Sequence, residues 1–135
     1  MKELIGVMTK DKFLKTLPFI CFQDTSFDPD RWHEKNPLWG QCVVAALLVQ
    51  DIFGGNLVCV WIPSGIHFLN EISLNNNGHW VWVDSTQDQF GDDIPHFSFH
   101  FHVQRDLLLG DDDTRERYEL LKSRFIERCV SHGRL

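Results

Sequence analysis

Hydrophobic and polar positions divide the chain into segments with different periods. Residues 42–53 are apolar at nearly every position, and a Gly-Gly pair follows them directly. A helix that is apolar on almost every face is buried, and glycine is the usual residue after a helix C-terminus. The preceding Asn36-Pro37 cannot continue a helix, because proline lacks an N–H and pushes the residue before it into an extended conformation. The pattern therefore predicts a central buried helix that begins near Gln41.

Two further segments have apolar positions at one-sided helical spacing. The first, residues 2–17, is followed by Pro18, which ends a helix. The second, residues 111–134, opens with an acidic cluster in which Asp113 is the expected N-cap, with Glu116 three residues later. Its apolar stripe, which we expect to pack on the domain, consists of Tyr118, Leu121, Phe125 and Cys129. Its arginines are expected on a solvated face: Arg115, Arg117 and Arg124.

Shorter runs with strand character follow the central helix. Residues 57–62 are an apolar run rich in Val and Trp before Pro63, which is typical of a buried strand. Residues 66–73 and 78–84 are two more strand-like segments, joined by an Asn-rich stretch that tolerates the positive φ of a tight turn. These two segments are predicted to pair as an antiparallel hairpin.

The predicted hairpin register pairs a histidine with an acid. If the turn is centred between Asn75 and Asn76, position 73 faces 78 and His67 faces Asp84. Residues directly opposite have Cβ atoms about 5 Å apart on one face of the sheet, close enough for an imidazole to bond a carboxylate. The pairing depends on the register, because a slip of one residue turns every side chain to the other face.

Histidine recurs at alternating positions near the end of the strand-rich part, over residues 96–102. In a strand, His96, His100 and His102 would share one face. Two or three histidines with a carboxylate could hold zinc, but no cysteine or glutamate of ligand spacing accompanies them, and solvent-facing histidines on an edge strand are commoner. We therefore predict neither a metal site nor a cofactor.

Length, composition and charge exclude several classes of protein. At 135 residues the chain fits one domain, residues 1–135, and its 43% apolar and 24% charged residues are those of an ordinary globular protein. No apolar run reaches the ~20 residues of a membrane span, and the N-terminus has no signal-peptide core, so we expect a cytoplasmic protein that makes no membrane contact. A net charge of −6 without a basic patch argues against a nucleic-acid partner.

Cys42 is the residue from which candidate chemistry starts. The four cysteines are widely spaced without a CxxC pair, which indicates reduced thiols: Cys21, Cys42, Cys59 and Cys129. Cys42 falls in the first turn of the central helix, where unpaired N–H groups and the helix dipole favour a thiolate. The alternative is a buried cysteine that acts only as a small hydrophobic residue.

The chain order Cys42, His67, Asp84 is that of papain-like, transglutaminase-like and cell-wall amidase folds. In such a triad the histidine takes the thiol proton and later gives it to the leaving group, while the acid orients the imidazole. The developing oxyanion needs hydrogen-bond donors, for which the Cys42 backbone N–H and a side-chain amide of Asn36 or Gln41 are the local candidates. The alternative is a structural His–Asp pair beside a buried cysteine.

Five strings form a pattern that covers most of the chain. They are DTSFDPDRW (24–32), NPLWGQCVVAALLVQDIFGG (36–55), HFLNEI (67–72), VDSTQDQFG (83–91) and TRERYELLKSR (114–124). Together they resemble the YunG-like family of small bacterial proteins, from whose usual pattern this chain departs with Leu69, Ser85 and a longer hairpin turn. The resemblance implies a papain-like fold and a thiol site at Cys42, His67 and Asp84, without implying a substrate.

We therefore expect an α+β, papain-like fold in which the central helix, with the cysteine at its N-terminus, packs on a small antiparallel sheet between N- and C-terminal helices. The expected function is that of a cysteine-dependent hydrolase or acyltransferase acting on the amide bond of a peptide, a protein or a small molecule through Cys42, His67 and Asp84. The alternative is a non-catalytic peptide- or protein-binding module of the same fold with an aromatic groove. Its candidate residues are Trp32, Trp39, Trp61, Trp80 and Trp82.

Overall fold

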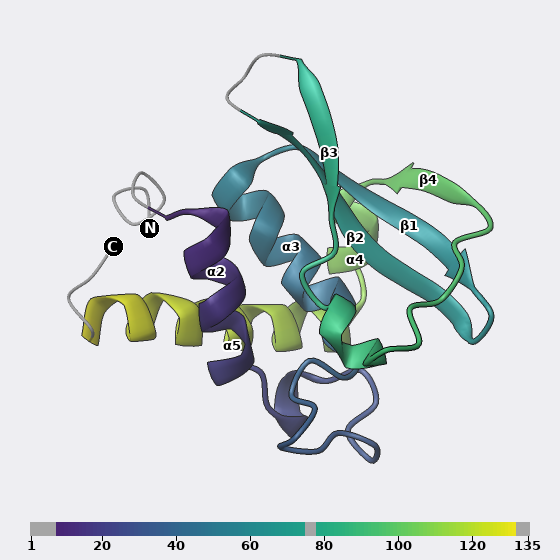
Figure 1. Cartoon of the computed structure of the whole chain (residues 1–135). Helices are drawn as coiled ribbons and strands as arrows, with labels where there is room; N and C mark the ends of the chain where they lie inside the picture. Colours follow the sequence, from purple (N-terminus) through teal and green to yellow (C-terminus); the bar gives the residue numbers. More distant parts are fainter. Residues whose placement is uncertain (1–7, 75–77, 132–135) are drawn as a thin grey trace.

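A small sheet and several helices make up the fold (Figure 1), which the computed structural model describes for residues 8–74 and 78–131. In chain order the elements are α2 (Lys10–Thr16), the 3-10 turns η1 (Leu17–Phe19) and η2 (Gln23–Thr25), α3 (Cys42–Phe53), β1 (Asn56–Ile62), β2 (Gly65–Leu74), β3 (His79–Val83), η3 (Gln87–Phe90), β4 (His100–Val103), α4 (Arg105–Leu109) and α5 (Asp112–Ser131). The class is α+β, as predicted. None of the helices in these residues has the length and apolar character that crossing a lipid bilayer demands.

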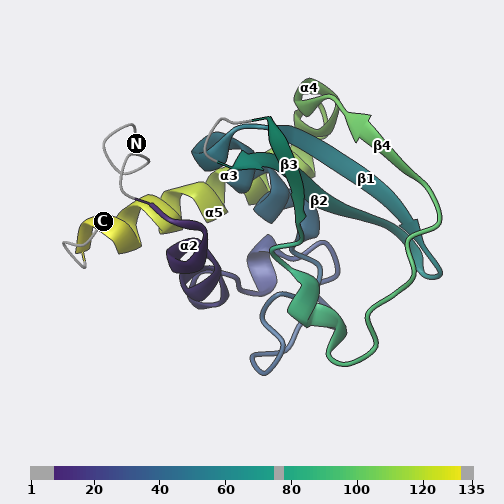
Figure 2. The same ribbon diagram turned by 45° about the horizontal axis from the view of Figure 1, so that its top comes forward.

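The sheet is antiparallel and has the strand order β3-β2-β1-β4. α3 lies on one face, where Nδ2 of Asn70 in β2 donates to the Ala46 carbonyl oxygen at 2.9 Å. α5 crosses α3, and α2 lies beside both helices (Figures 1 and 2), where the Phe13 ring contacts Phe53 and Phe125. α3 is thus the central element, enclosed by the sheet and the other helices.

α3 begins at Cys42 and ends at Phe53, as predicted from its apolar run and its flanking residues. Most of its side chains are buried, and Gly54, with a φ of 74°, follows the last turn. Each fully buried Val, Leu or Ile side chain stabilises the fold by roughly 1.5–3 kcal/mol. Packing on every side therefore fixes the position of the helix and of the cysteine at its N-terminus.

The opposite face of the sheet has its own apolar cluster. The buried residues of this cluster are Val58, Val60, Ile62 and Leu69. Phe90 and Phe97, from the connection between β3 and β4, pack against the cluster. The same connection begins with Asp84, so the segment that covers this face also supplies a candidate site residue.

The β2–β3 hairpin forms, but the predicted register was wrong by two residues. β3 pairs with β2 so that Asn70 faces Val83 and Leu74 faces His79. In this register His67 lies level with position 86 rather than with Asp84. Side chains on a strand alternate between the two faces, so a shift of two residues leaves His67 and Asp84 on the same face. The predicted turn centre, at 75 and 76, lies outside the described residues.

Two predicted elements are shorter in the structure. β4 contains only the last part of the predicted strand at 96–102 and pairs with β1 from Val60 to Leu57. Within the described residues the N-terminal helix begins at Lys10, after a side-chain cap by Thr9, and residues 2–7 of the predicted segment lie outside the described residues. The predicted strand at 57–62 is confirmed as β1.

α5 confirms one prediction and corrects two. The stripe is buried as predicted and consists of Tyr118, Leu121, Phe125 and Cys129. The cap is Asp111 rather than Asp113, because Oδ2 of Asp111 accepts the Thr114 N–H at 2.9 Å. Arg117 is buried instead of solvated, because its Nη1 donates to the Thr25 carbonyl oxygen at 3.1 Å.

Candidate functional site

Cys42 is the first residue of α3, and its side chain is partly exposed. The chain reaches it through Gly40, whose φ of 74° lies in the region that favours glycine. A Cβ at Gly40 would collide with the Ser26 side chain and crowd the Asp28 backbone nitrogen. Oγ of Ser26 donates to the Trp39 carbonyl oxygen at 2.8 Å and holds the two segments together. The glycine before the cysteine thus lets this loop pack against the start of the helix.

His67 lies on β2 and is 1% exposed. Its Nε2 is 2.8 Å from Oδ2 of Asp84, the residue that follows β3. The rings of Phe90 and Phe97 contact the imidazole, with centroid distances of 5.1 and 6.1 Å. Because Nε2 is bound to the acid, Nδ1 is the ring nitrogen left for the hydrogen bond with Cys42. The structure therefore brings Cys42, His67 and Asp84 together.

The surroundings of His67 raise its pKa. Burial disfavours the charged imidazolium and lowers the pKa, but hydrogen bonds and charge interactions with Asp84 and Cys42 outweigh burial and raise it from 6.5 to about 9. The imidazole is therefore protonated at neutral pH, and a protonated imidazole beside a thiol favours the nucleophilic thiolate. Burial raises the pKa of the other thiols, which belong to Cys21, Cys59 and Cys129.

Cys42 and His67 line one cavity of about 370 Å³. The loop before α3, the β1–β2 end of the sheet, the β3–β4 connection and the start of α5 contribute to its walls. Trp39, Phe68 and Phe90 are among its apolar lining residues. Cavities that hold small ligands have volumes of about 300–1,000 Å³. This cavity is therefore large enough for a small molecule or one end of a peptide to reach Cys42.

Comparison with known proteins assigns the chain to a family. The sequence profile described as YunG protein matches residues 9–130, a range that includes Cys42, His67 and Asp84. The chain belongs to the YunG family. The uncharacterized protein YunG of Bacillus subtilis (strain 168) is 34% identical over 95 residues, which cover 70% of this chain and 75% of that protein. No solved structure matches the chain.

In this YunG-family chain, the two side-chain amides predicted as oxyanion donors are engaged elsewhere. Nδ2 of Asn36 donates to the Gln89 carbonyl oxygen at 3.0 Å, and Nε2 of Gln41 donates to the Phe22 carbonyl oxygen at 2.9 Å. Neither residue lines the cavity. Both amides fix the loops around Cys42. Of the predicted oxyanion donors, the backbone N–H of Cys42, in the first turn of α3, is the one that remains at the site.

Several polar residues of the cavity were not predicted as site residues from the sequence, and two of them, Gln89 and Arg117, are buried. Oε1 of Gln89 accepts the Gly40 N–H at 3.3 Å, and its Nε2 donates to Oγ1 of Thr86 at 2.9 Å. Arg117, on α5, lines the same cavity. Gln89 stands in the string VDSTQDQFG and Arg117 in TRERYELLKSR, so resemblance to the YunG family was the available signal for both.

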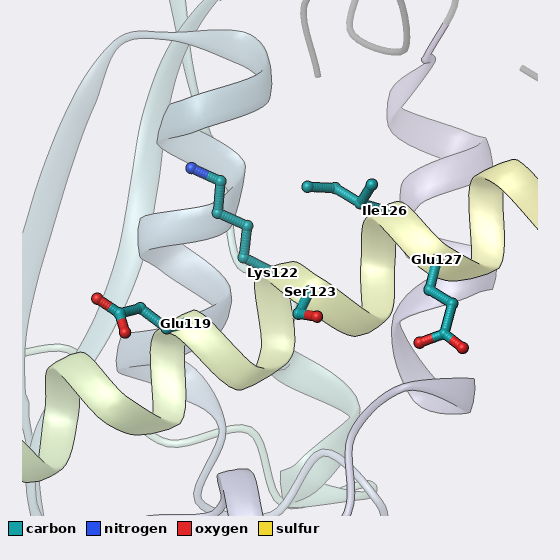
Figure 3. Close-up of a pocket in the computed structure, with 5 residues that line it drawn as sticks. All are labelled: Glu119, Lys122, Ser123, Ile126 and Glu127. Atoms are coloured by element: carbon teal, nitrogen blue, oxygen red, sulfur yellow. The ribbon is translucent and has the colours of Figure 1, made fainter.

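A second depression, of about 440 Å³, lies along α5 (Figure 3). Its lining residues all belong to this helix and are Glu119, Lys122, Ser123, Ile126 and Glu127. They include neither a cysteine nor a histidine, and Lys122 is paired with Asp51 at 3.7 Å. The depression therefore has no part in the candidate site.

The alternating histidines do not gather as metal ligands. Within residues 8–74 and 78–131, no group of three His, Cys, Asp or Glu side chains is arranged to hold a metal ion. Nε2 of His102 is 3.1 Å from Oε1 of Glu71, and the His100 ring contacts Trp82. These two histidines are thus engaged with residues of neighbouring strands.

Proposed function

We propose that this protein is a cysteine-dependent hydrolase or acyltransferase that acts on an amide bond, with a papain-like arrangement of its catalytic residues. The observation that carries the proposal is the line from Asp84 through buried His67 to Cys42 beside a cavity. A histidine with a carboxylate on one ring nitrogen and a thiol at the other is the arrangement that prepares a cysteine nucleophile. A purely structural His–Asp pair requires neither a partly exposed thiol nor a cavity.

Each of the three residues has a defined part in the proposed reaction. The Cys42 thiolate attacks the amide carbonyl carbon, protonated His67 gives its proton to the leaving nitrogen, and the amine departs with the electrons of the C–N bond. Neutral His67 then takes a proton from water or from an acceptor amine, which attacks the thioester and releases the Cys42 thiolate. Asp84 orients the imidazole and stabilises its positive charge.

The oxyanion of this reaction needs donors beside Cys42. The Cys42 backbone N–H lies in the first turn of α3, where the helix dipole also favours negative charge. Gln89 lines the cavity, and hydrogen bonds to Gly40 and Thr86 fix its amide. An amide NH₂ has two N–H donors, and Thr86 uses one of them. The proposed donors are therefore the Cys42 N–H and Gln89 in place of Asn36 or Gln41.

Alkylation of Cys42 tests this function. Iodoacetamide at pH 7 should modify Cys42 ahead of the other cysteines, because the pKa of each of those buried thiols is raised: Cys21, Cys59 and Cys129. His67→Asn should slow the modification of Cys42 about tenfold or more, because the variant lacks both the group that takes the thiol proton and the positive charge beside the sulfur. Mass spectrometry of the Cys42 peptide after timed quenching measures the rate.

His96→Asn is the matched control for this experiment. His96 is exposed and does not line the cavity, so the variant should react at the wild-type rate. Equal Cys42 rates in the wild type and in folded His67→Asn would contradict the proposal, as would a folded wild type whose Cys42 resists the reagent.

A second candidate function is that of a non-catalytic peptide- or protein-binding module. It is favoured by Trp61 and Trp80, which are 53% and 52% exposed. Trp39, in contrast, lines the cavity with Cys42. If the protein is a binding module, Cys42→Ala should restore the phenotype of a strain that lacks the gene as well as the wild-type protein does. If it is an enzyme that uses Cys42, the variant should not restore that phenotype.

A further inference from the structure

Arg117 contributes a buried positive charge to the cavity that holds Cys42. It is 6% exposed and lines the cavity. Its Nε donates to Oδ2 of Asp113 at 2.9 Å, and its Nη1 donates to the Thr25 carbonyl oxygen at 3.1 Å. Its buried Nη2 has no hydrogen-bond partner among the described residues. A guanidinium has five N–H donors, so these two bonds leave unused donors on the edge formed by Nη1 and Nη2.

This edge matches an anionic ligand with two oxygens. Guanidinium groups bind carboxylates through two parallel N–H···O bonds, and a buried donor that stays unsatisfied is costly. Asp113 is 72% exposed, so water screens its charge. Asp28, which also lines the cavity, accepts the Trp39 Nε1–H at 3.2 Å. None of these hydrogen bonds engages Nη2, so this end of the guanidinium remains available to a ligand.

The rest of the lining limits the size and the character of the ligand. The volume of about 370 Å³ is near the small end of the range of about 300–1,000 Å³ for ligand cavities. Trp39, Phe68 and Leu108 give the cavity apolar walls. The Phe27 ring lies over the Arg117 guanidinium at 5.7 Å and is 74% exposed, so rotation of this side chain gives a ligand access to Arg117.

We propose that Arg117 binds a carboxylate of the substrate, and that the substrate is a small N-acyl amino acid or the C-terminal end of a peptide, with an apolar side chain next to the free carboxylate. The inference rests on the proposed function, because Cys42 attacks the amide of the same molecule. Arg117 makes and breaks no bond; it selects the substrate and holds it against Cys42.

Two affinity labels that differ in one group test the inference. Chloroacetyl-leucine has a free carboxylate, and chloroacetyl-leucinamide has a neutral amide in its place. With both, the Cys42 thiolate displaces chloride, so a C–S bond replaces the C–Cl bond and chloride leaves with the bonding electrons. At equal low concentration, chloroacetyl-leucine should modify Cys42 about tenfold faster or more than chloroacetyl-leucinamide does. The carboxylate can form a charge-assisted hydrogen-bonded pair with Arg117, and the neutral amide cannot. Intact-protein mass spectrometry measures both rates.

Variants of α5 separate Arg117 from general electrostatics. Arg117→Gln should abolish the preference for the carboxylate label over the amide label, with both rates divided by the rate of the same variant with neutral iodoacetamide. Arg115→Gln removes the same charge from the same helix outside the cavity and should keep the preference. Circular dichroism checks the fold. If Arg117→Gln does not fold, Arg117→Lys is used in its place. Lysine keeps the positive charge but lacks the planar guanidinium with its parallel N–H donors, so Arg117→Lys should lower the preference several-fold.

The outcomes distinguish this inference from the proposed function. Equal rates for the two labels, in a wild type whose Cys42 reacts with iodoacetamide, would overturn the carboxylate inference and leave the proposed function intact. A preference as large as that of the wild type in folded Arg117→Gln or Arg117→Lys would also overturn it, because the carboxylate would then be bound elsewhere. A Cys42 that reacts with none of the three reagents would overturn the proposed function and this inference with it.

Discussion

At the scale of single residues, the chemistry of the candidate site depends on how β2 buries His67. Its Nε2 is bound to Asp84, and the Phe90 ring excludes water from one side of the imidazole. Burial alone would lower the pKa of His67, but the carboxylate and the Cys42 thiol raise it to about 9. At slightly alkaline pH most histidine side chains are neutral, whereas His67 is protonated.

The raised pKa of His67 couples its protonation to folding. Because the pKa is about 9 in the folded protein and 6.5 in the unfolded chain, the resulting stabilisation is complete below about pH 6.5 and is lost as the pH rises to about 9. The urea midpoint of the wild type should therefore fall across this window relative to that of His67→Asn. Tryptophan fluorescence follows the unfolding, and His96→Asn should behave like the wild type. A difference between wild type and His67→Asn that is constant across the window would contradict the assignment.

At the scale of elements, close backbone contacts fix both ends of α3. Gly40 lets the preceding loop pack against the N-terminal end, and Gly55 does the same for β2 at the other end. Gly55 has a φ of 81°, and a Cβ there would collide with the Glu71 carbonyl oxygen. Gly54 has a φ of 74°, but a Cβ there would meet no atom within 4 Å. Position 54 requires glycine for its backbone conformation alone. Position 55 requires glycine for its backbone conformation and also for the close packing against β2.

Gly55→Ala should therefore lower the free energy of unfolding more than Gly54→Ala does. Both substitutions place a side chain at a positive φ, which costs about 1–3 kcal/mol. Gly55→Ala adds a collision with the β2 backbone that no side-chain rotation relieves. Urea unfolding at pH 7 measures both losses. Losses of equal size would show that β2 does not pack against Gly55 in solution.

At the scale of the whole molecule, one side chain connects α3, α4 and α5. Arg105 of α4 donates to the Leu47 carbonyl oxygen at 3.3 Å and to Oε1 of Gln50 at 3.0 Å, both in α3. It also bonds the Tyr118 hydroxyl of α5 at 2.9 Å and pairs with Asp51 of α3 at 2.9 Å. Arg105 thus stabilises the arrangement that brings the start of α5, with Arg117, beside the N-terminal end of α3.

Arg105→Ala should lower the free energy of unfolding by about 2–3 kcal/mol, because hydrogen bonds to charged groups contribute about 1.5–3 kcal/mol and Asp51 would lose its closest cation. Arg31→Ala is the control, since its pair with Asp28 is longer, at 3.8 Å, and its side chain is 77% exposed. Such exposed pairs contribute at most about 1 kcal/mol. Urea unfolding compares the two variants, and losses of the same size would argue against the role of Arg105.

The sequence by itself determined the local elements, the family and the candidate triad. The apolar run of α3 and the residues at its ends predict the helix because periodicity and capping act within a few residues. The hairpin prediction brought His67 and Asp84 together although its register was wrong by two residues, because side chains on a strand alternate between two faces. An error of one residue would have separated them.

Only the tertiary structure decided which polar side chains serve the cavity. Asn36 and Gln41 are next to Cys42 in the chain, yet carbonyl oxygens of distant loops engage their amides. Arg117 has the spacing of a solvated helix residue, yet the Thr25 carbonyl oxygen and the Phe27 ring bury it against the cavity. Periodicity reports which face of a helix is apolar. It carries no information on which distant loop packs over a given position, because that depends on how the layers of the fold are stacked.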